Sequence, residues 1–385
     1  MAFSWYVRFM TEIHGTTTAK FEAVRAAMAA NFDDGFEVGA SVAVTVDGEM
    51  VADLWGGHKD MERTQAWESD TITNVWSSTK TMTALCALIL ADRGDLDFHT
   101  PVAHYWPEFA ANGKESIEVR HLMSHTSGLS GWETPIEAND LYDWEKATSL
   151  LAAQAPWWEP GKGSGYHAIT QGYLVGEVIR RVAGQSVGTF FAKEVAGPLG
   201  ADFHIGLAAE HHHRVANVIP PSTGLDGLVE PGSLAERTLG NPKMAAERSW
   251  ETAWREAEIP AAGGHGNARS AAKVQTVMAC GGEVGGLRLL SAKGCEAVFE
   301  EQCNGIDQVL GIELRHGIGY GLSSPSTPMP NERTHYWGGW GGSLVVVDQE
   351  NRVCVTYMMN RMGDGTVGDT RAANIVAAAY MSHFS

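Results

Sequence analysis

The spacing of apolar positions changes along the chain and predicts different elements in different parts of it. Between about residues 18 and 31, apolar residues recur at intervals of three and four, which predicts an amphipathic helix. In the next apolar segment, about 39–55, two strand-like runs flank Asp47-Gly48, a residue pair that tight hairpin turns prefer. A second helix is predicted after residue 80, and Gly94 ends it in the C-capping position.

The long middle of the chain and its C-terminal part differ in pattern. Residues 95 to about 265 combine helical segments with breaks that contain Gly and Pro, which predicts helices and loops. Four strand-like segments and an Ala- and Val-rich helix (about 370–383) then follow; the strand segments are 316–322, 334–337, 343–348 and 352–359. Strands and a helix at both ends, with helices between them, predict one sheet built from the two termini and a helical insertion.

Composition and charge narrow the class of protein and its partners. The chain of 385 residues is 44% hydrophobic and 19% charged, as is typical of soluble globular proteins. Its net charge of -18 offers nothing that would neutralise phosphates, so we expect no nucleic-acid partner. The best candidate for a membrane span, Thr83–Leu90, is far too short to cross a bilayer, so we expect no membrane partner.

The N-terminus and the cysteines indicate a reducing compartment. Residues 1–15 lack the basic cluster, apolar core and cleavage site of an export signal, so we expect a cytoplasmic location. Met10, which precedes Thr-Glu, is an alternative to Met1 as the native start. The five cysteines form an odd set without CxxC spacing, and we expect reduced thiols that pack in the interior.

One short segment, WSSTK at residues 76–80, carries a candidate nucleophile. On the first turn of the helix that follows, Ser77 and Lys80 lie at i and i+3 on one face, where the amine reaches the hydroxyl. A serine hydroxyl needs an adjacent base, and a lysine supplies one when its pKa is lowered by burial or nearby positive charge. The alternative is structural, because serine is a favoured N-cap and Ser-x-x-Lys also occurs by chance.

Three further segments follow in order along the chain. They are VRHLMSHTSGL (119–129), WWEPGKGSGYHAITQGYLVGEVIRRVAG (157–184) and HYWGGWGGSLVVVD (335–348). Together with WSSTK they resemble the serine β-lactamase and penicillin-binding-protein superfamily, and within it class C β-lactamases and especially family VIII carboxylesterases. The resemblance spans most of the chain.

The resemblance implies an α/β fold of the β-lactamase/DD-peptidase kind. An antiparallel sheet flanked by helices would be formed by about residues 1–75 and 266–385. A mostly helical region would be formed by residues 76–265, with the active site at the junction of the two regions.

The resemblance also assigns roles to three side chains. Ser77 would attack the acyl carbon and carry the covalent intermediate, and Lys80 would share its proton and position it. Tyr166 matches the tyrosine of the Tyr-x-Asn motif. As phenolate or through Lys80 it would act as general base, and it would then protonate the leaving group. The structural alternative for Tyr166 is a buried tyrosine whose hydroxyl is satisfied near a helix start.

The third motif of the superfamily, Lys-Thr-Gly or His-Thr-Gly, corresponds here to Trp337-Gly338-Gly339. The resemblance implies that this strand lines the site and that the backbone N–H groups of Ser77 and Trp340 form an oxyanion hole. Glycines suit a strand that substrate approaches closely. The alternative is a glycine-rich bulge with two packing tryptophans.

Two departures from the superfamily pattern bear on the substrate. Ala168 replaces the asparagine of Tyr-x-Asn, and Trp337 replaces the lysine that would bind a substrate carboxylate. Both changes disfavour β-lactams and D-Ala-D-Ala peptides and suit a neutral ester. We therefore expect a carboxylesterase that cleaves short-chain esters through acyl-Ser77, with a small-molecule ester as its partner and no metal or cofactor.

Alternatives to this function remain open. Within the superfamily they are a β-lactamase, a D-amino-acid peptidase or amidase, and an acyltransferase to an alcohol. Outside it, the chain would be a binding module without catalytic activity. The sequence leaves the physiological ester and the oligomeric state undetermined.

Other motifs have structural interpretations. Ser186 stands in a G-x-S-x-G segment between two helical patterns, which indicates an interhelical turn rather than a nucleophile elbow. The three histidines His211–His213 lack ligand spacing and indicate a solvated loop. His125 is expected to have a structural role. Four tryptophans are candidates for an acyl pocket, namely Trp132, Trp157, Trp158 and Trp340.

Overall fold

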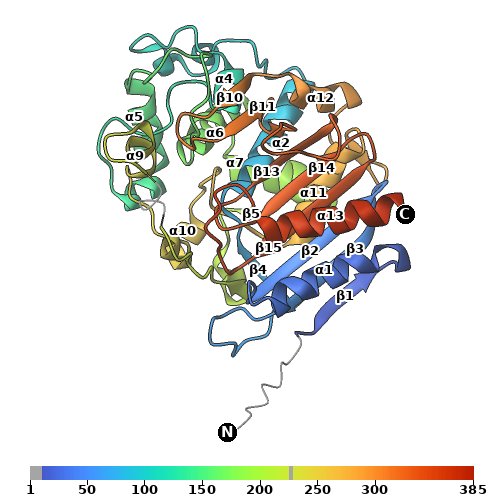
Figure 1. Ribbon diagram of the computed structural model, residues 1–385. Coiled ribbons are helices and arrows are strands. Elements are labelled where there is room, and N and C mark those ends of the chain that lie inside the picture. The colour runs from blue at the N-terminus through green and yellow to red at the C-terminus, as the bar shows by residue number, and fades with distance from the viewer. Residues whose placement is uncertain (1–10, 225–228) are drawn as a thin grey trace.

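The computed structural model describes residues 11–224 and 229–385 (Figure 1). The alternative start at Met10 therefore lies outside the described residues. The largest unit is a nine-stranded sheet in the order β1-β3-β2-β15-β14-β13-β12-β11-β10, and all neighbouring strands are antiparallel. Its strands are β1 (Ile13–Thr17), β2 (Gly39–Val46), β3 (Glu49–Gly57), β10 (Cys303–Ile306), β11 (Glu313–His316), β12 (Gly321–Leu322), β13 (Thr334–Gly338), β14 (Leu344–Asp348) and β15 (Val353–Met359).

The sheet joins the two ends of the chain. Strand β15 pairs with β2 over the whole length of β15, which confirms that one sheet is built from both termini. The hairpin between β2 and β3 is also confirmed, because Asp47 and Gly48 have φ of +51° and +87°, the left-handed values that a primed turn requires. The central strands β14 and β15 are buried along their whole length, and most of their side chains are apolar on both faces of the sheet.

Helices cover both faces of the sheet. Helices α1 (Glu22–Asp33) and α13 (Thr370–Phe384) pack together on one face, and α11 (Ala268–Ala279) covers the other (Figure 1). Helix α2 (Thr79–Asp92) lies in the interior and packs against α6 (Thr170–Ala183) as well as against α11 and β13. All its residues from Thr79 to Leu90 are buried, which explains the apolar run from Ala84 to Leu90. No described helix is long and apolar enough to cross a membrane.

The middle of the chain is mostly helices and loops, as predicted. Its other helices are α3 (Val102–Tyr105), α4 (Val119–Met123), α5 (Trp144–Ala153), α7 (Val187–Phe191), α8 (Gly197–Leu199), α9 (Leu234–Leu239) and α10 (Thr252–Glu256), and α12 (Ala292–Glu296) follows α11. A small second sheet, in the order β5-β7-β4-β6, consists of β4 (Ile72–Asn74), β5 (His204–Ile205), β6 (Val215–Ala216) and β7 (Gly264–Gly266). Strands β8 (Glu283–Val284) and β9 (Leu287–Arg288) form a separate hairpin. The division of the chain at residues 76 and 265 stays a prediction.

Some elements differ from the sequence prediction. The continuous strand predicted over 316–322 is wrong, because His316 ends β11 and a turn closed by the Gly317 N–H to the Tyr320 carbonyl (2.9 Å) precedes β12. The first helix begins as a 3₁₀ turn, Ala19–Phe21, before α1. Strands β1 and β10 were not predicted, since both lie at sheet edges and bury only alternate, partly covered side chains.

Candidate active site

Ser77 lies in a 3₁₀ turn, Trp76–Ser78, that leads into α2. The preceding residue, Trp76, has φ of +48°, a left-handed conformation that costs about 1–3 kcal/mol for a residue with a side chain. The carbonyl of Trp76 accepts a hydrogen bond from Thr79 Oγ1 at 2.6 Å, and its ring packs between Trp254 and Trp340. This strained turn presents Ser77 at the start of the helix. The N-cap interpretation of the serines is not supported, because Ser78 stands in the N-cap position of α2 but its side chain makes no capping hydrogen bond.

Lys80 is buried beneath Ser77, and its amine has three partners. The Nζ atom lies 3.0 Å from Ser77 Oγ, 2.7 Å from the Ala168 carbonyl oxygen and 3.0 Å from the Ala261 carbonyl oxygen. Burial lowers the pKa of the Lys80 amine well below its usual 10.5. Burial therefore disfavours the charged form of this amine. Neither carbonyl could be identified in the sequence, because a backbone oxygen carries no residue signature.

Tyr166 also contacts Ser77. Its hydroxyl donates to Ser77 Oγ at 2.6 Å, and Lys80 Nζ lies 4.9 Å from the centre of its ring. Burial raises the pKa of the Tyr166 phenol to about 12, although the hydrogen bond with Ser77 opposes the shift. The structure thus brings together the three side chains selected from the sequence.

A buried polar cluster holds the segment of Tyr166 in place. Asp307 Oδ1 accepts the backbone N–H groups of Tyr166 (3.0 Å), Val309 (3.0 Å) and Leu310 (2.9 Å). The His167 backbone N–H donates to Nδ1 of His125 at 3.1 Å. His125 therefore has structural contacts, as expected from the sequence. Asp307 was missed, since no motif marks a carboxylate that binds only backbone.

The ring of His167 has a defined tautomer. Its Nε2 accepts the backbone N–H of Leu129 at 3.3 Å, so its Nδ1 carries the proton and donates to the Gly165 carbonyl at 2.5 Å. Burial lowers the pKa of His167 to about 4, which keeps the ring neutral near pH 7.

The segment Trp337-Gly338-Gly339 leaves β13 beside the Ser77 turn. The Trp337 indole is buried against the rings of His125 and Tyr166, with ring centres 5.6 and 5.7 Å apart. A Cβ on Gly339 would lie 2.4 Å from the Val75 carbonyl oxygen, so only glycine allows the two backbones to approach this closely. A Cβ on Gly338 would similarly lie 2.6 Å from the Gly368 nitrogen.

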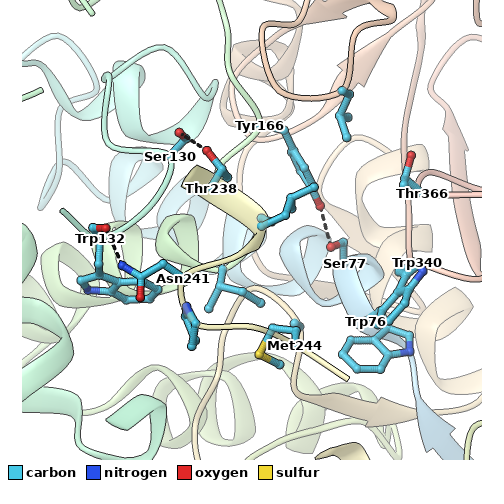
Figure 2. A pocket seen from close by; sticks show the side chains of 16 residues that line it. Trp76, Ser77, Ser130, Trp132, Tyr166, Thr238, Asn241, Met244, Trp340 and Thr366 are labelled. Carbon is cyan, nitrogen blue, oxygen red and sulfur yellow. Dashed lines mark hydrogen bonds between the residues drawn. The ribbon is translucent and has the colours of Figure 1, made fainter. Parts of the chain in front are cut away.

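A cavity opens in front of Ser77 and Tyr166 (Figure 2). Its apolar walls include Trp76, Trp132, Ile169, Leu239, Met244 and Trp340. In the part of the chain that the structure describes, no lining side chain carries a formal charge. Ser130 and Thr238 also line the cavity and are hydrogen-bonded to each other at 2.6 Å. The cavity therefore suits an uncharged, largely apolar ligand.

Two of the four candidate tryptophans do not line this cavity, so the prediction is wrong for them. Trp157 donates to Glu133 at 2.6 Å and packs under the guanidinium of Arg237. Trp158 donates to the Gly163 carbonyl at 3.3 Å and packs against His167. Trp132 and Trp340 do line the cavity.

The G-x-S-x-G segment and the histidines His211–His213 lie in structural segments, as expected, but the histidines form a helical turn. Ser186 begins α7, accepts the Thr189 N–H at 3.3 Å and donates to Glu258 at 2.6 Å, so it is an interhelical cap. His211–His213 lie in a 3₁₀ turn, Ala209–Arg214, rather than in an irregular loop. Among the described residues, no group of His, Cys, Asp or Glu side chains has the arrangement of a metal site.

Some known proteins are similar to this chain over most of its length. The Beta-lactamase family model matches residues 24–380. Esterase/beta-lactamase LipL of Mycobacterium tuberculosis is 34% identical over 364 residues, which are 91% of this chain and 83% of that protein.

Solved structures agree with these sequence matches. The crystal structure of a family VIII carboxylesterase is 43% identical with a TM-score of 0.91, and the match covers 96% of this chain and 100% of the other. A penicillin-binding-protein homologue from Caulobacter crescentus is 37% identical with a TM-score of 0.90, again over 96% and 100% of the two chains.

Proposed function

The chain belongs to the Beta-lactamase family and is a serine hydrolase related to esterases, and we propose that it hydrolyses short-chain neutral carboxylic esters through acyl-Ser77. The observation that carries the proposal is the contact of Ser77 Oγ with both Lys80 Nζ (3.0 Å) and the Tyr166 hydroxyl (2.6 Å) at an uncharged cavity. A nucleophile between two acid–base groups is the arrangement that acyl transfer requires.

Lys80 is the proposed base for acylation. A neutral amine has two N–H donors and one lone pair. The carbonyls of Ala168 and Ala261 accept the two donors, and the lone pair is then directed to the Ser77 hydroxyl. The lowered pKa of Lys80 and the raised pKa of Tyr166 both favour this proton arrangement over a charged amine beside a phenolate.

The proposed reaction conserves protons within this group of residues. Ser77 Oγ bonds to the ester carbon while its proton passes to Lys80. When the tetrahedral intermediate collapses, the bond to the leaving oxygen breaks and Tyr166 gives that oxygen its proton. Lys80 then returns its proton to Tyr166. Water repeats the sequence in deacylation, releasing the acid and restoring Ser77.

The backbone N–H groups of Ser77 and Trp340 are the proposed oxyanion hole. Within residues 11–224 and 229–385, no acceptor pairs with the Trp340 N–H, which leaves this donor for a ligand. Trp340 also lines the cavity beside Ser77. One such donor contributes about 100- to 1,000-fold to kcat in serine hydrolases.

The surroundings of the site support a neutral ester as substrate. Ala168 presents a methyl group to the cavity where an amide would contact a β-lactam or peptide. Trp337 is buried in an aromatic cluster, so its position offers no cation to a substrate carboxylate. A β-lactamase activity is the second candidate, because the relative LipL is named both esterase and beta-lactamase.

One set of assays tests the proposal. Wild type and Ser77→Ala would be compared on p-nitrophenyl acetate, butyrate and laurate and on a chromogenic cephalosporin. We expect fast turnover of the two short esters, weak turnover of the cephalosporin, and loss of both with Ser77→Ala. Fast cephalosporin opening with poor ester turnover would refute the substrate assignment. A new ester formed on addition of an alcohol would reveal an acyltransferase.

A further inference from the structure

The two segments that carry the proposed oxyanion donors touch each other behind the site. The turn that precedes Ser77 contains Val75, and the loop that carries Trp340 contains Gly339. A Cβ on Gly339 would lie 2.4 Å from the Val75 carbonyl oxygen and 2.3 Å from Ser343 Oγ. The distance between the two N–H donors therefore depends on how these segments are joined.

Two buried serines join them. Ser343 Oγ donates to the Val75 carbonyl at 2.8 Å, and Ser78 Oγ lies 2.9 Å from Ser343 Oγ. A hydroxyl has a single proton, so Ser343 gives its own to Val75 and Ser78 must be the donor in the second bond. The side chains of both serines are fully buried.

Ser343 also closes the loop that carries Gly339 and Trp340, to which it belongs. Its backbone carbonyl accepts the Gly339 N–H at 2.8 Å, which closes the turn that contains Trp340. Its hydroxyl holds the carbonyl that directly precedes Trp76, the residue in the left-handed conformation before Ser77. One residue thus contacts the backbone on both sides of the proposed oxyanion hole.

We propose that Ser343, assisted by Ser78, is a positioning residue that sets the spacing of the Ser77 and Trp340 N–H groups. The proposal rests on the proposed function of these groups. Neither serine touches the cavity, so each acts through the backbone. Without the Ser343 hydroxyl, the Val75 carbonyl keeps only the Ser78 backbone N–H (3.2 Å), a bond within the turn itself, so the turn and the loop can separate. Because oxyanion donors must be placed to within a fraction of an ångström, the transition state is affected more than substrate binding.

The test compares Ser343→Ala, Ser78→Ala and Ser249→Ala with wild type on p-nitrophenyl butyrate. Ser249 is the matched control, because its buried hydroxyl also donates to a carbonyl at 2.8 Å but it does not line the cavity. We expect kcat to fall about 10- to 100-fold in Ser343→Ala, with KM changed less than threefold. Ser78→Ala keeps the bond to Val75 and should lose about two- to threefold. The control should keep its kcat.

Inhibition by butylboronic acid gives a second readout. Its adduct with serine is tetrahedral and places a negative oxygen where the oxyanion forms, so its Ki should rise in proportion to the loss of kcat/KM. A purely structural role would lower the melting temperature and leave both readouts unchanged.

Two results would overturn the proposal. The first is a Ser343→Ala variant whose kcat and boronate Ki both stay within twofold of the wild-type values. If that variant does not fold, an unchanged kcat and Ki in Ser78→Ala decide against it. Failure of the proposed function itself looks different, since wild type would then neither turn over the ester nor bind the boronate.

Discussion

Replacing Tyr166 with phenylalanine removes one oxygen and leaves the ring in its aromatic cluster. The lost hydroxyl donates to Ser77 Oγ at 2.6 Å and is the proposed proton donor to the leaving group. Loss of a general acid lowers the rate by about 100- to 10,000-fold, or about 3–5 kcal/mol of transition-state stabilisation. KM should change little, because the ring still fills the same space beside His125 and Trp337.

The size of the loss should depend on the leaving group. p-Nitrophenolate is a stable anion and leaves without a proton, whereas an alkoxide leaves only when it is protonated. We therefore expect kcat/KM to fall at least about tenfold more for ethyl butyrate than for p-nitrophenyl butyrate, a difference of about 1.4 kcal/mol. The parameter kcat/KM is the appropriate one, because it reports the acylation step for both esters.

Lys80→Ala provides the contrast. Lys80 removes the proton from Ser77 before any bond to the leaving group breaks, so its loss should affect the two esters to similar extents. Equal losses for both esters in Tyr166→Phe would refute the role of Tyr166 as acid. A stability measurement completes the design, since one buried hydrogen bond contributes only about 1 kcal/mol to unfolding and the variant should stay folded.

Further predictions concern the base, a false motif and the cavity wall. Because burial lowers the pKa of Lys80, log kcat/KM of the wild type should fall with unit slope as the pH drops through that pKa. Lys80→Arg should be inactive at every pH of this profile. In the unfolded chain Lys80 stays protonated up to about pH 10.5, whereas in the folded chain its pKa is lower. Between these two pKa values the contribution of Lys80 to the free energy of unfolding should therefore rise with pH, and urea titrations would measure it. Ser186→Ala should keep kcat within about twofold and lose about 1 kcal/mol of stability in urea titrations, as a lost cap does; an inactive folded variant would contradict this. Met244→Ala widens the cavity and should raise the laurate-to-butyrate ratio of kcat/KM several-fold, because each buried CH₂ contributes about 0.8 kcal/mol; an unchanged ratio would place the acyl chain elsewhere.

The elements that the sequence predicted well are those fixed by local preferences. Asp47-Gly48 accepts positive φ at both positions, and α2 is stopped by Gly94 in the left-handed conformation. The strands β14 and β15 were recognisable because burial on both faces makes their sequences mostly apolar. Ser77 and Lys80 were identifiable for a similar reason, since their relation depends only on one helical turn.

The parts that could not be predicted depend on contacts between distant segments. The carbonyl of Ala261 binds Lys80 across 181 positions of sequence, and any residue could supply it. Ser343 bonds to Val75 across 268 positions, and nothing in the segment 335–348 around it specifies this contact. The cavity combines side chains from loops whose courses follow from packing, so Trp157 and Trp158 were as plausible in sequence as Trp132.

The central claim, that Ser77 carries a covalent acyl group, is tested most directly by trapping that group. Wild type would be mixed with p-nitrophenyl butyrate, quenched in acid within milliseconds, digested with trypsin and analysed by mass spectrometry. We predict a butyryl group on Ser77 in the peptide of residues 64–80, and its absence in Ser77→Ala. A butyryl group on Ser186, or turnover of the ester with no acyl-enzyme at any time, would contradict the account.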